Sequence, residues 1–88
     1  MLKCTFASAT ESLEESALEG IFVQSVTGEL GILRDHLPIV VKLKDNSLVR
    51  LKTEKNQKKY LVGKNTFLQF SKNEALILAQ SFSEAKNY

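Results

Sequence analysis

Short apolar runs recur along this chain from Ile21 onward, and only a few polar residues separate each run from the next. An amphipathic helix needs at least about ten residues to bury one face, so helices do not fit between runs this closely spaced. The pattern therefore predicts β-strands joined by turns, in a mostly antiparallel arrangement. The expected strands are residues 21–26, 30–33, 39–44, 48–52, 60–62, 66–70 and 75–82.

The breaks between these runs are rich in Asn, Asp and Lys. Asn and Asp tolerate the backbone of tight turns, so we predict a hairpin at each of the breaks 44–47, 54–57, 64–65 and 71–74. A single sheet with this many apolar residues would leave one apolar face exposed to water. We therefore predict an all-β fold, a two-layer antiparallel β-sandwich of short strands, with a small barrel as the alternative.

Two stretches are less clear in their pattern. Residues 10–20 fit a capped helical turn as well as a strand, and we expect a strand from Ala17 onward. The polar residues 83–88 are expected to form a frayed tail.

The length of 88 residues fits one domain, residues 1–88, because a chain this short cannot support two separate cores. With 43% hydrophobic and 25% charged residues, the composition is typical of a folded globular protein. No apolar stretch approaches the roughly 20 residues needed to cross a bilayer, so we predict no transmembrane segment. The first residues also lack the basic start and long apolar centre of a secretion signal.

Catalytic chemistry has little support in the sequence. His36 is the single histidine, and a nucleophile would need it as a base with an orienting acid such as Asp35 or Glu29 brought close. One histidine and one cysteine, Cys4, cannot supply a structural zinc site. No glycine-rich phosphate loop of the Gly-Lys-Ser/Thr type is present. We predict a protein that is not an enzyme, with no metal site and no cofactor.

The most specific part of the sequence is residues 28–38. It is expected to be a shaped loop, because two of its residues permit positive φ or close backbone approach and one fixes φ: Gly28, Gly31 and Pro38. Such loops usually display contact residues from a rigid scaffold. The candidate contact residues are four polar side chains: Glu29, Arg34, Asp35 and His36.

This segment resembles a loop of the amino-terminal domain in the ATP synthase epsilon subunit family, the counterpart of the mitochondrial delta subunit. The family form is G-E-L-G-I-x-P-G-H-A-P. Here the sequence is Gly28-Glu29-Leu30-Gly31-Ile32-Leu33-Arg34-Asp35-His36-Leu37-Pro38, with Arg34-Asp35 in place of Pro-Gly. Residues 43–51, 61–70 and 73–79 resemble the family's L-K-P-G-x-x-R-I, V-S-G-G-F-L-E-V and N-x-V-T-V-L-A stretches, so the resemblance covers most of the chain.

The resemblance implies a non-catalytic rotor subunit of a proton- or sodium-translocating F-type ATP synthase. Such a β-sandwich would sit at the base of the central stalk, link the gamma subunit to the c-ring, and share its complex with the alpha and beta subunits. Glu29 and His36 match family positions at this end of the rotor. The implied location is peripheral, on the cytoplasmic face of the bacterial inner (plasma) membrane. The family usually continues into a helical hairpin that restrains ATP hydrolysis, and the printed sequence stops near Tyr88, so that activity is not inferred.

A different function class remains open at this point. Five or more short strands, a basic middle and the aromatic residues Tyr60, Phe67 and Phe70 would suit an oligonucleotide-binding barrel. The net charge of only +2 and the acidic first quarter argue against it. We therefore expect no nucleic-acid partner.

Overall fold

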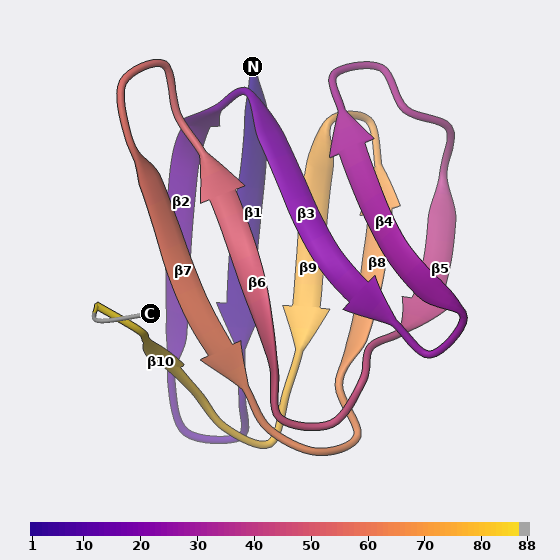
Figure 1. The fold of residues 1–88 in the computed structure, drawn as a ribbon, viewed down its shortest axis with the longest axis vertical. Coiled ribbons are helices and arrows are strands. Elements are labelled where there is room, and N and C mark those ends of the chain that lie inside the picture. Colours follow the sequence, from indigo (N-terminus) through magenta and orange to yellow (C-terminus); the bar gives the residue numbers. More distant parts are fainter. Residues whose placement is uncertain (87–88) are drawn as a thin grey trace.

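Ten β-strands and no helix make up the described part of the chain, residues 1–86 of a computed structural model (Figure 1). They form two five-stranded sheets that pack face to face: sheet A in the order β2-β1-β9-β8-β5, and sheet B in the order β10-β7-β6-β3-β4. The bounds are β1 (Leu2–Ala7), β2 (Ser12–Leu18), β3 (Gly20–Ser25), β4 (Gly28–Leu33), β5 (Ile39–Lys42), β6 (Ser47–Lys52), β7 (Gln57–Val62), β8 (Phe67–Ser71), β9 (Glu74–Leu78) and β10 (Phe82–Glu84).

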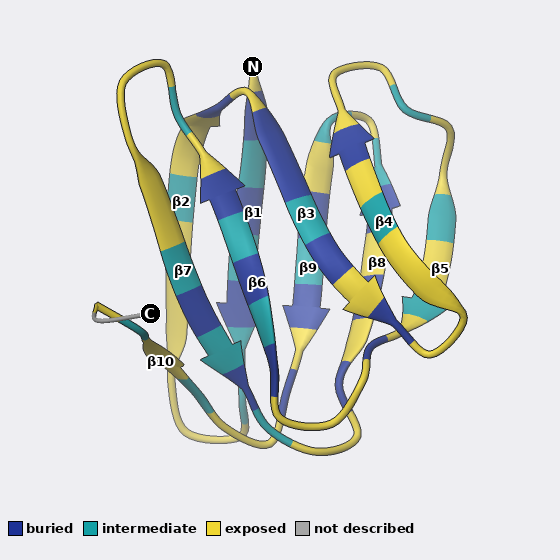
Figure 2. Cartoon of the chain, in the orientation of Figure 1, coloured by how far each residue is buried: buried dark blue, intermediate teal, exposed yellow. Residues whose placement is uncertain are grey.

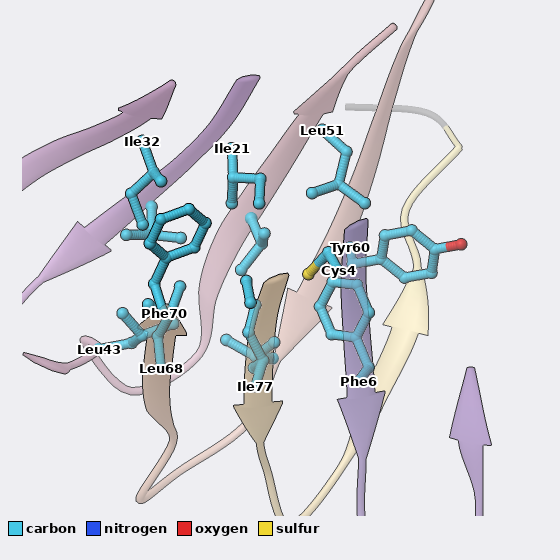
Figure 3. Packing of buried hydrophobic residues seen from close by; sticks show 14 of the residues in the cluster. Cys4, Phe6, Ile21, Ile32, Leu43, Leu51, Tyr60, Leu68, Phe70 and Ile77 are labelled. Carbon is cyan, nitrogen blue, oxygen red and sulfur yellow. The ribbon is translucent and has the colours of Figure 1, made fainter. Parts of the chain in front are cut away.

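The core lies between the two sheets and follows from the alternation of side chains along each strand (Figure 2). On β6, for example, Val49 and Leu51 are buried while Arg50 between them faces outward. Aromatic rings join the layers: Phe6 of sheet A lies with its ring centroid 4.6 Å from that of Tyr60 in sheet B (Figure 3). The predicted two-layer sandwich is confirmed.

One pair of strands departs from the antiparallel pattern. β1 pairs antiparallel with β2 on one side and parallel with β9 on the other, with Cys4 opposite Ala75 and Phe6 opposite Ile77. No strand was expected at residues 2–7. The reason is that β1 gains half of its pairing from a segment some 70 residues away, and no local turn signals such a contact.

The expected strand at 75–82 is in fact two strands in different sheets. β9 ends at Leu78, the chain crosses the end of the sandwich, and β10 pairs antiparallel with β7. The backbone amide of Ala85 also donates to the carbonyl of Lys59 at 2.8 Å. The expectation of a frayed tail is thus wrong for residues 83–85, because this edge of sheet B offers free backbone partners. Residues 87 and 88 of that tail lie outside the described residues.

The predicted turns are of two kinds. Breaks 54–57 and 71–74 form hairpins, β6–β7 and β8–β9. Breaks 44–47 and 64–65 instead carry the chain from one sheet to the other, so the hairpins expected there are wrong. The amide of Asn65 donates to Asp45 Oδ1 at 3.1 Å, which holds these two crossings together.

A bulge interrupts β2, which begins at Ser12, earlier than expected. Leu2 pairs with Leu18 while Cys4 pairs with Glu15, so β2 carries one extra residue over this stretch. Within the bulge, Ala17 adopts a φ of 57°, in the left-handed region, which accommodates the extra residue. An L-residue there costs about 1–2 kcal/mol, and glycine avoids that cost while losing roughly 0.5–1 kcal/mol in chain entropy.

Replacing Ala17 with glycine is therefore expected to raise the free energy of unfolding by about 0.5–1 kcal/mol. Urea unfolding followed by circular dichroism measures the change. Ala7→Gly, in the regular strand β1, is the matched control and should lower stability by about 0.5–1 kcal/mol. Equal losses for both variants would contradict the argument from the bulge.

Candidate functional site

The segment 28–38 is not one loop. Residues 28–33 form strand β4, paired with β3 from Ser25 opposite Gly28 to Gly20 opposite Leu33, and only residues 34–38 form a loop. Glu29 and Arg34 therefore lie at opposite ends of β4, about 17 Å apart at roughly 3.3 Å per residue (Figure 1). The expectation of a single shaped loop is wrong, because the β3–β4 pairing continues through it.

Gly28 has the positive φ that was expected of it, at 134°, and ends the turn that leads into β4. The buried hydroxyl of Ser25 organises this turn: it donates to the Gly28 carbonyl at 2.7 Å and accepts from the Thr27 amide at 3.2 Å. Gly31 shapes no loop, since it lies inside β4, where a side chain would meet the Phe22 ring at 3.1 Å.

Glu29 lies on the outer face of sheet B, near the β3–β4 turn. Its Oε1 accepts a hydrogen bond from Arg50 Nη2 at 3.2 Å, and both side chains are exposed. The carboxylate is thus fixed in position yet open to a partner. An exposed pair of this kind contributes only about 0–1 kcal/mol to stability, so Glu29 can exchange Arg50 for another cation at little cost.

The loop 34–38 is held in place by the β8–β9 turn. Asp35 takes a left-handed φ of 66°, and its amide donates to Asn73 Oδ1 at 2.7 Å. Asn73 Nδ2 donates back to Asp35 Oδ1 at 3.2 Å. The His36 ring stands edge-on to Phe70, with ring centroids 5.9 Å apart. Asp35 and His36 therefore help to fix the loop as well as being displayed on it.

The same loop presents side chains that make few contacts. Arg34 is exposed and its Nε lies 4.0 Å from Asp35 Oδ2. Leu37 is 78% exposed, a large value for an apolar side chain on a fixed loop. Pro38 follows it and leads directly into β5. This end of the molecule thus offers one cation, one apolar side chain and one imidazole together.

A larger surface was missed in the sequence. The outer face of sheet A carries an apolar patch, made of Ala7, Val40, Phe67, Leu76 and Leu78. Strand pairing places three of its members in one row, with Phe67 opposite Leu78 and Leu78 opposite Ala7, while Gln69 lies between Val40 and Leu76 in the next row. Val40, Phe67 and Leu78 are all exposed. The sequence could have predicted this patch: Phe67 and Leu78 directly neighbour the buried residues Leu68 and Ile77, so in a strand their apolar side chains must point to the outer face.

A second missed cluster joins the two sheets at their β2 and β7 sides. Tyr60 Oη donates to Glu15 Oε2 at 2.5 Å, and Lys58 Nζ lies 3.2 Å from the same oxygen. The Glu15 side chain is only 18% exposed, whereas the neighbouring Glu14 faces outward, 3.9 Å from Lys3. The extra residue of the β2 bulge lies directly after Glu15 and sets this register.

This cluster changes the acid–base properties of two buried groups. Burial, and then the charge of Glu15, raises the pKa of the Cys4 thiol to about 12. Burial, and then the hydrogen bond to Glu15, raises the pKa of the Tyr60 hydroxyl above its usual range. Both groups are therefore neutral at neutral pH, and the cluster acts as a structural tie. Within residues 1–86, no group of three or more His, Cys, Asp or Glu side chains is placed to hold a metal ion.

The aromatic residues of the alternative function do not share a surface. Tyr60 and Phe70 are buried in the core, while Phe67 lies on the outer face of sheet A. Bases cannot stack on rings that are packed between two sheets. The stacking surface expected for an oligonucleotide-binding barrel is therefore wrong.

Taken together, the described residues form a two-layer β-sandwich with apolar side chains exposed on one sheet and a fixed polar loop at one end. Residues 1–85 match the family model "ATP synthase, Delta/Epsilon chain, beta-sandwich domain", and the chain belongs to this family. The resemblance found in the sequence is confirmed.

Relatives and solved structures agree with this assignment. The ATP synthase epsilon chains of Mycobacterium avium (strain 104) and Mycobacterium leprae (strain TN) are each 33% identical over 61 residues, which is 69% of this chain and 50% of theirs. The chain thus spans about half the length of these curated relatives. No helix long and apolar enough to span a membrane occurs in residues 1–86.

The fold also matches chains in two mitochondrial ATP synthase structures. One is the Euglena gracilis OSCP/F1/c-ring assembly in rotational state 1, with a TM-score of 0.82, 18% identity, and coverage of 92% of this chain and 51% of that chain. The other is the Tetrahymena thermophila central stalk/c-ring, with a TM-score of 0.75, 9% identity, and coverage of 93% and 65%. At these identities the likeness establishes the fold.

Proposed function

We propose that this chain is a non-catalytic subunit of the central stalk of an F-type ATP synthase, where it links the gamma subunit to the c-ring. The observation that carries the proposal is the separation of two kinds of contact surface on one sandwich. An apolar patch lies on the outer face of sheet A, while Glu29 and polar turns lie at one end of the molecule. A linker between two partners needs such separate surfaces.

The apolar patch is the surface best suited to a permanent partner. Exposed apolar side chains that cluster on one sheet face lose water when another protein covers them, and such contacts are typical of stable assemblies. We assign this surface to the gamma subunit. The loop with Arg34, Asp35, His36 and Leu37 leads directly into β5 of the same sheet, so it can extend the same contact.

The opposite end of β4 suits a polar, transient or sliding contact. The turns there include residues 26–27, 44–46 and 63–66, and Glu29 stands beside them (Figure 1). A carboxylate that is already positioned by Arg50 can pair with a basic loop of another protein, which gives orientation more than affinity. We assign this end to the c-ring, which would place the chain peripherally at the cytoplasmic face of a bacterial inner (plasma) membrane.

The proposed role is mechanical. Torque that reaches the c-ring end has to pass through the sandwich to the gamma surface, and from there toward the alpha and beta subunits. A core packed from both sheets, closed by the Phe6–Tyr60 contact and by the Glu15–Tyr60 hydrogen bond, resists shear between the layers. The fixed loop 34–38 loses little entropy on binding, because Asn73 and Phe70 already hold it.

Purification of the tagged chain from its native membranes tests the proposed function. Recovery of the alpha, beta and gamma subunits, identified by mass spectrometry, is expected. Recovery of nucleic acid or unrelated proteins without these subunits would overturn the proposal.

The double variant Glu29→Lys/His36→Ala is expected to lower recovery of the complex about tenfold and to reduce proton pumping, while the isolated chain stays folded. Charge reversal at Glu29 removes the ring contact, and loss of the imidazole weakens the loop. Glu54→Lys, an exposed charge reversal in the β6–β7 turn of sheet B, is the control and should leave recovery unchanged. Equal recovery for all three chains would remove Glu29 and His36 from the contact surfaces.

A further inference from the structure

The outer face of sheet B carries a groove that the proposed function leaves unused. Its volume is about 600 Å³, and it is lined by Phe22, Arg50, Lys52, Thr53, Glu54, Lys55, Asn56 and Gln57. Its lining residues come from β3, β6 and the β6–β7 turn, in the sheet opposite to the one that carries the apolar patch.

The floor of the groove is an aromatic ring held by two glycines. Phe22 is paired with Gly31 on β4 and with Arg50 on β6. A Cβ added at Gly20 would come within 2.8 Å of the ring, and one added at Gly31 within 3.1 Å. The ring therefore lies flat on the backbone of the sheet, with Arg50 placed over it at 5.5 Å from the centroid.

The walls of the groove are predominantly cationic. Arg50, Lys52 and Lys55 stand around the ring, against Glu54 alone within the lining of this groove. The turn that carries Lys55 is ordered, because Thr53 Oγ1 donates to the Asn56 carbonyl and accepts from the Asn56 amide, each at 3.0 Å. Cations on an ordered turn lose less freedom when they bind an anion.

Apolar side chains continue the same face beside the cations. Leu48 and Leu61 lie directly opposite each other on β6 and β7, both half-buried and facing outward. Next along the strands, Arg50 lies directly opposite Lys59. The apolar pair and the cationic groove thus lie next to each other on one outward-facing surface of sheet B.

We propose that this face binds an acidic, amphipathic segment of a partner protein. Carboxylates of the segment pair with Lys52, Lys55 and Arg50, and its apolar side chains cover Phe22 and the Leu48–Leu61 pair. Arg50 is already placed by Glu29 at 3.2 Å, so it can pass from one carboxylate to another. The charge of the groove and the apolar row beside it together select this partner chemistry.

A protein segment fits this face better than a nucleic acid does. Single strands are bound by a succession of stacking platforms, and the lining of this groove has one aromatic ring, Phe22. Glu29 and Glu54 at its border would also repel a phosphate backbone.

Binding of a short synthetic peptide of Glu, Ser and Leu, with Leu at every third or fourth position, tests the proposal. Fluorescence anisotropy gives the Kd, and the amide signals of the ¹⁵N-labelled chain locate the site on β3, β6 and β7. The variant Lys52→Gln/Lys55→Gln is expected to weaken binding by about three- to tenfold, since each exposed pair contributes up to about 1 kcal/mol. The control Lys42→Gln/Lys72→Gln removes the same charge elsewhere and should bind as the unchanged chain does.

Three results would overturn the proposal: equal weakening by both double variants, signal changes confined to sheet A, or a Kd for oligothymidine or for a matched Lys-containing peptide as low as that for the acidic peptide. The amide signals also report whether each variant is folded. The outcome is independent of the proposed gamma contact, because the groove and the apolar patch lie on different sheets.

Discussion

Raising the pH from 9 to 12 is expected to remove about 4 kcal/mol from the free energy of unfolding through Cys4 alone. The thiol is fully buried beside Glu15, and its pKa rises from 9.0 in the unfolded chain to about 12 in the folded one. Between these values the folded state holds a proton that the unfolded state has lost. Stability is therefore complete below pH 9 and falls as pH rises, by up to about 1.4 kcal/mol per pH unit.

Tyr60 adds to this loss above pH 10. Its pKa is raised by burial and by the hydrogen bond to Glu15, so its folded form also keeps a proton that the unfolded form releases. The slope of stability against pH should therefore steepen where the two groups overlap. Both effects come from the cluster that joins β2 to β7.

Urea unfolding between pH 8 and pH 11, with reductant present, measures these slopes. Cys4→Ala lowers stability at all pH values because it leaves a small cavity, but it should reduce the slope above pH 9 by up to about 1.4 kcal/mol per pH unit. Tyr60→Phe should reduce the slope only above pH 10. An unchanged slope in Cys4→Ala would contradict the assignment of alkaline sensitivity to this thiol.

A single charge in the apolar patch is expected to weaken binding to the gamma subunit by about 30- to 100-fold. Leu78 is half-exposed at the centre of the patch, opposite Phe67 and beside Ala7. In the proposed complex an aspartate there would be buried without a partner, at a cost of about 2–3 kcal/mol. Because the side chain is 50% exposed in the isolated chain, Leu78→Asp should still fold.

Leu33→Asp is the matched control for this prediction. Leu33 is 56% exposed and lies on the outer face of sheet B, so the same substitution adds the same charge away from the patch. Co-purification with a tagged gamma subunit compares the two variants, and thermal unfolding verifies that each is folded. Equal retention of gamma by both variants would show that the patch is not the gamma surface.

Local patterns in the sequence predicted most strands of the sandwich. Val49 and Leu51 alternate with outward-facing residues, and the motif from Gly28 to Pro38 gave the family. What local patterns could not predict were contacts between distant segments. β1 was missed because its second partner is β9, and the crossings at 44–47 and 64–65 resemble hairpin turns in composition.

The candidate site was predicted only in part, because its arrangement also depends on how strands pair. Glu29, Arg34, Asp35 and His36 lie within eight consecutive residues, yet the extended strand β4 separates the first from the other three. The inward turn of Glu15 depends on a bulge, which shifts the alternation by one residue. Of the surfaces that the sequence analysis missed, the apolar patch is the one that local patterns could have predicted, because residues such as Phe67 are apolar at outward-facing positions of their strands.

The position of β1 also governs how this chain can fold during its synthesis. β1 comes before every other strand of the described chain, yet it sits in the interior of sheet A, between β2 and β9, and β9 ends only at Leu78. Sheet A cannot close until nearly the whole described chain has been made, and contacts between such distant segments slow folding. Leu2, Cys4 and Phe6, which are buried in the finished sandwich, thus stay open to solvent and to chaperones until β9 has been made.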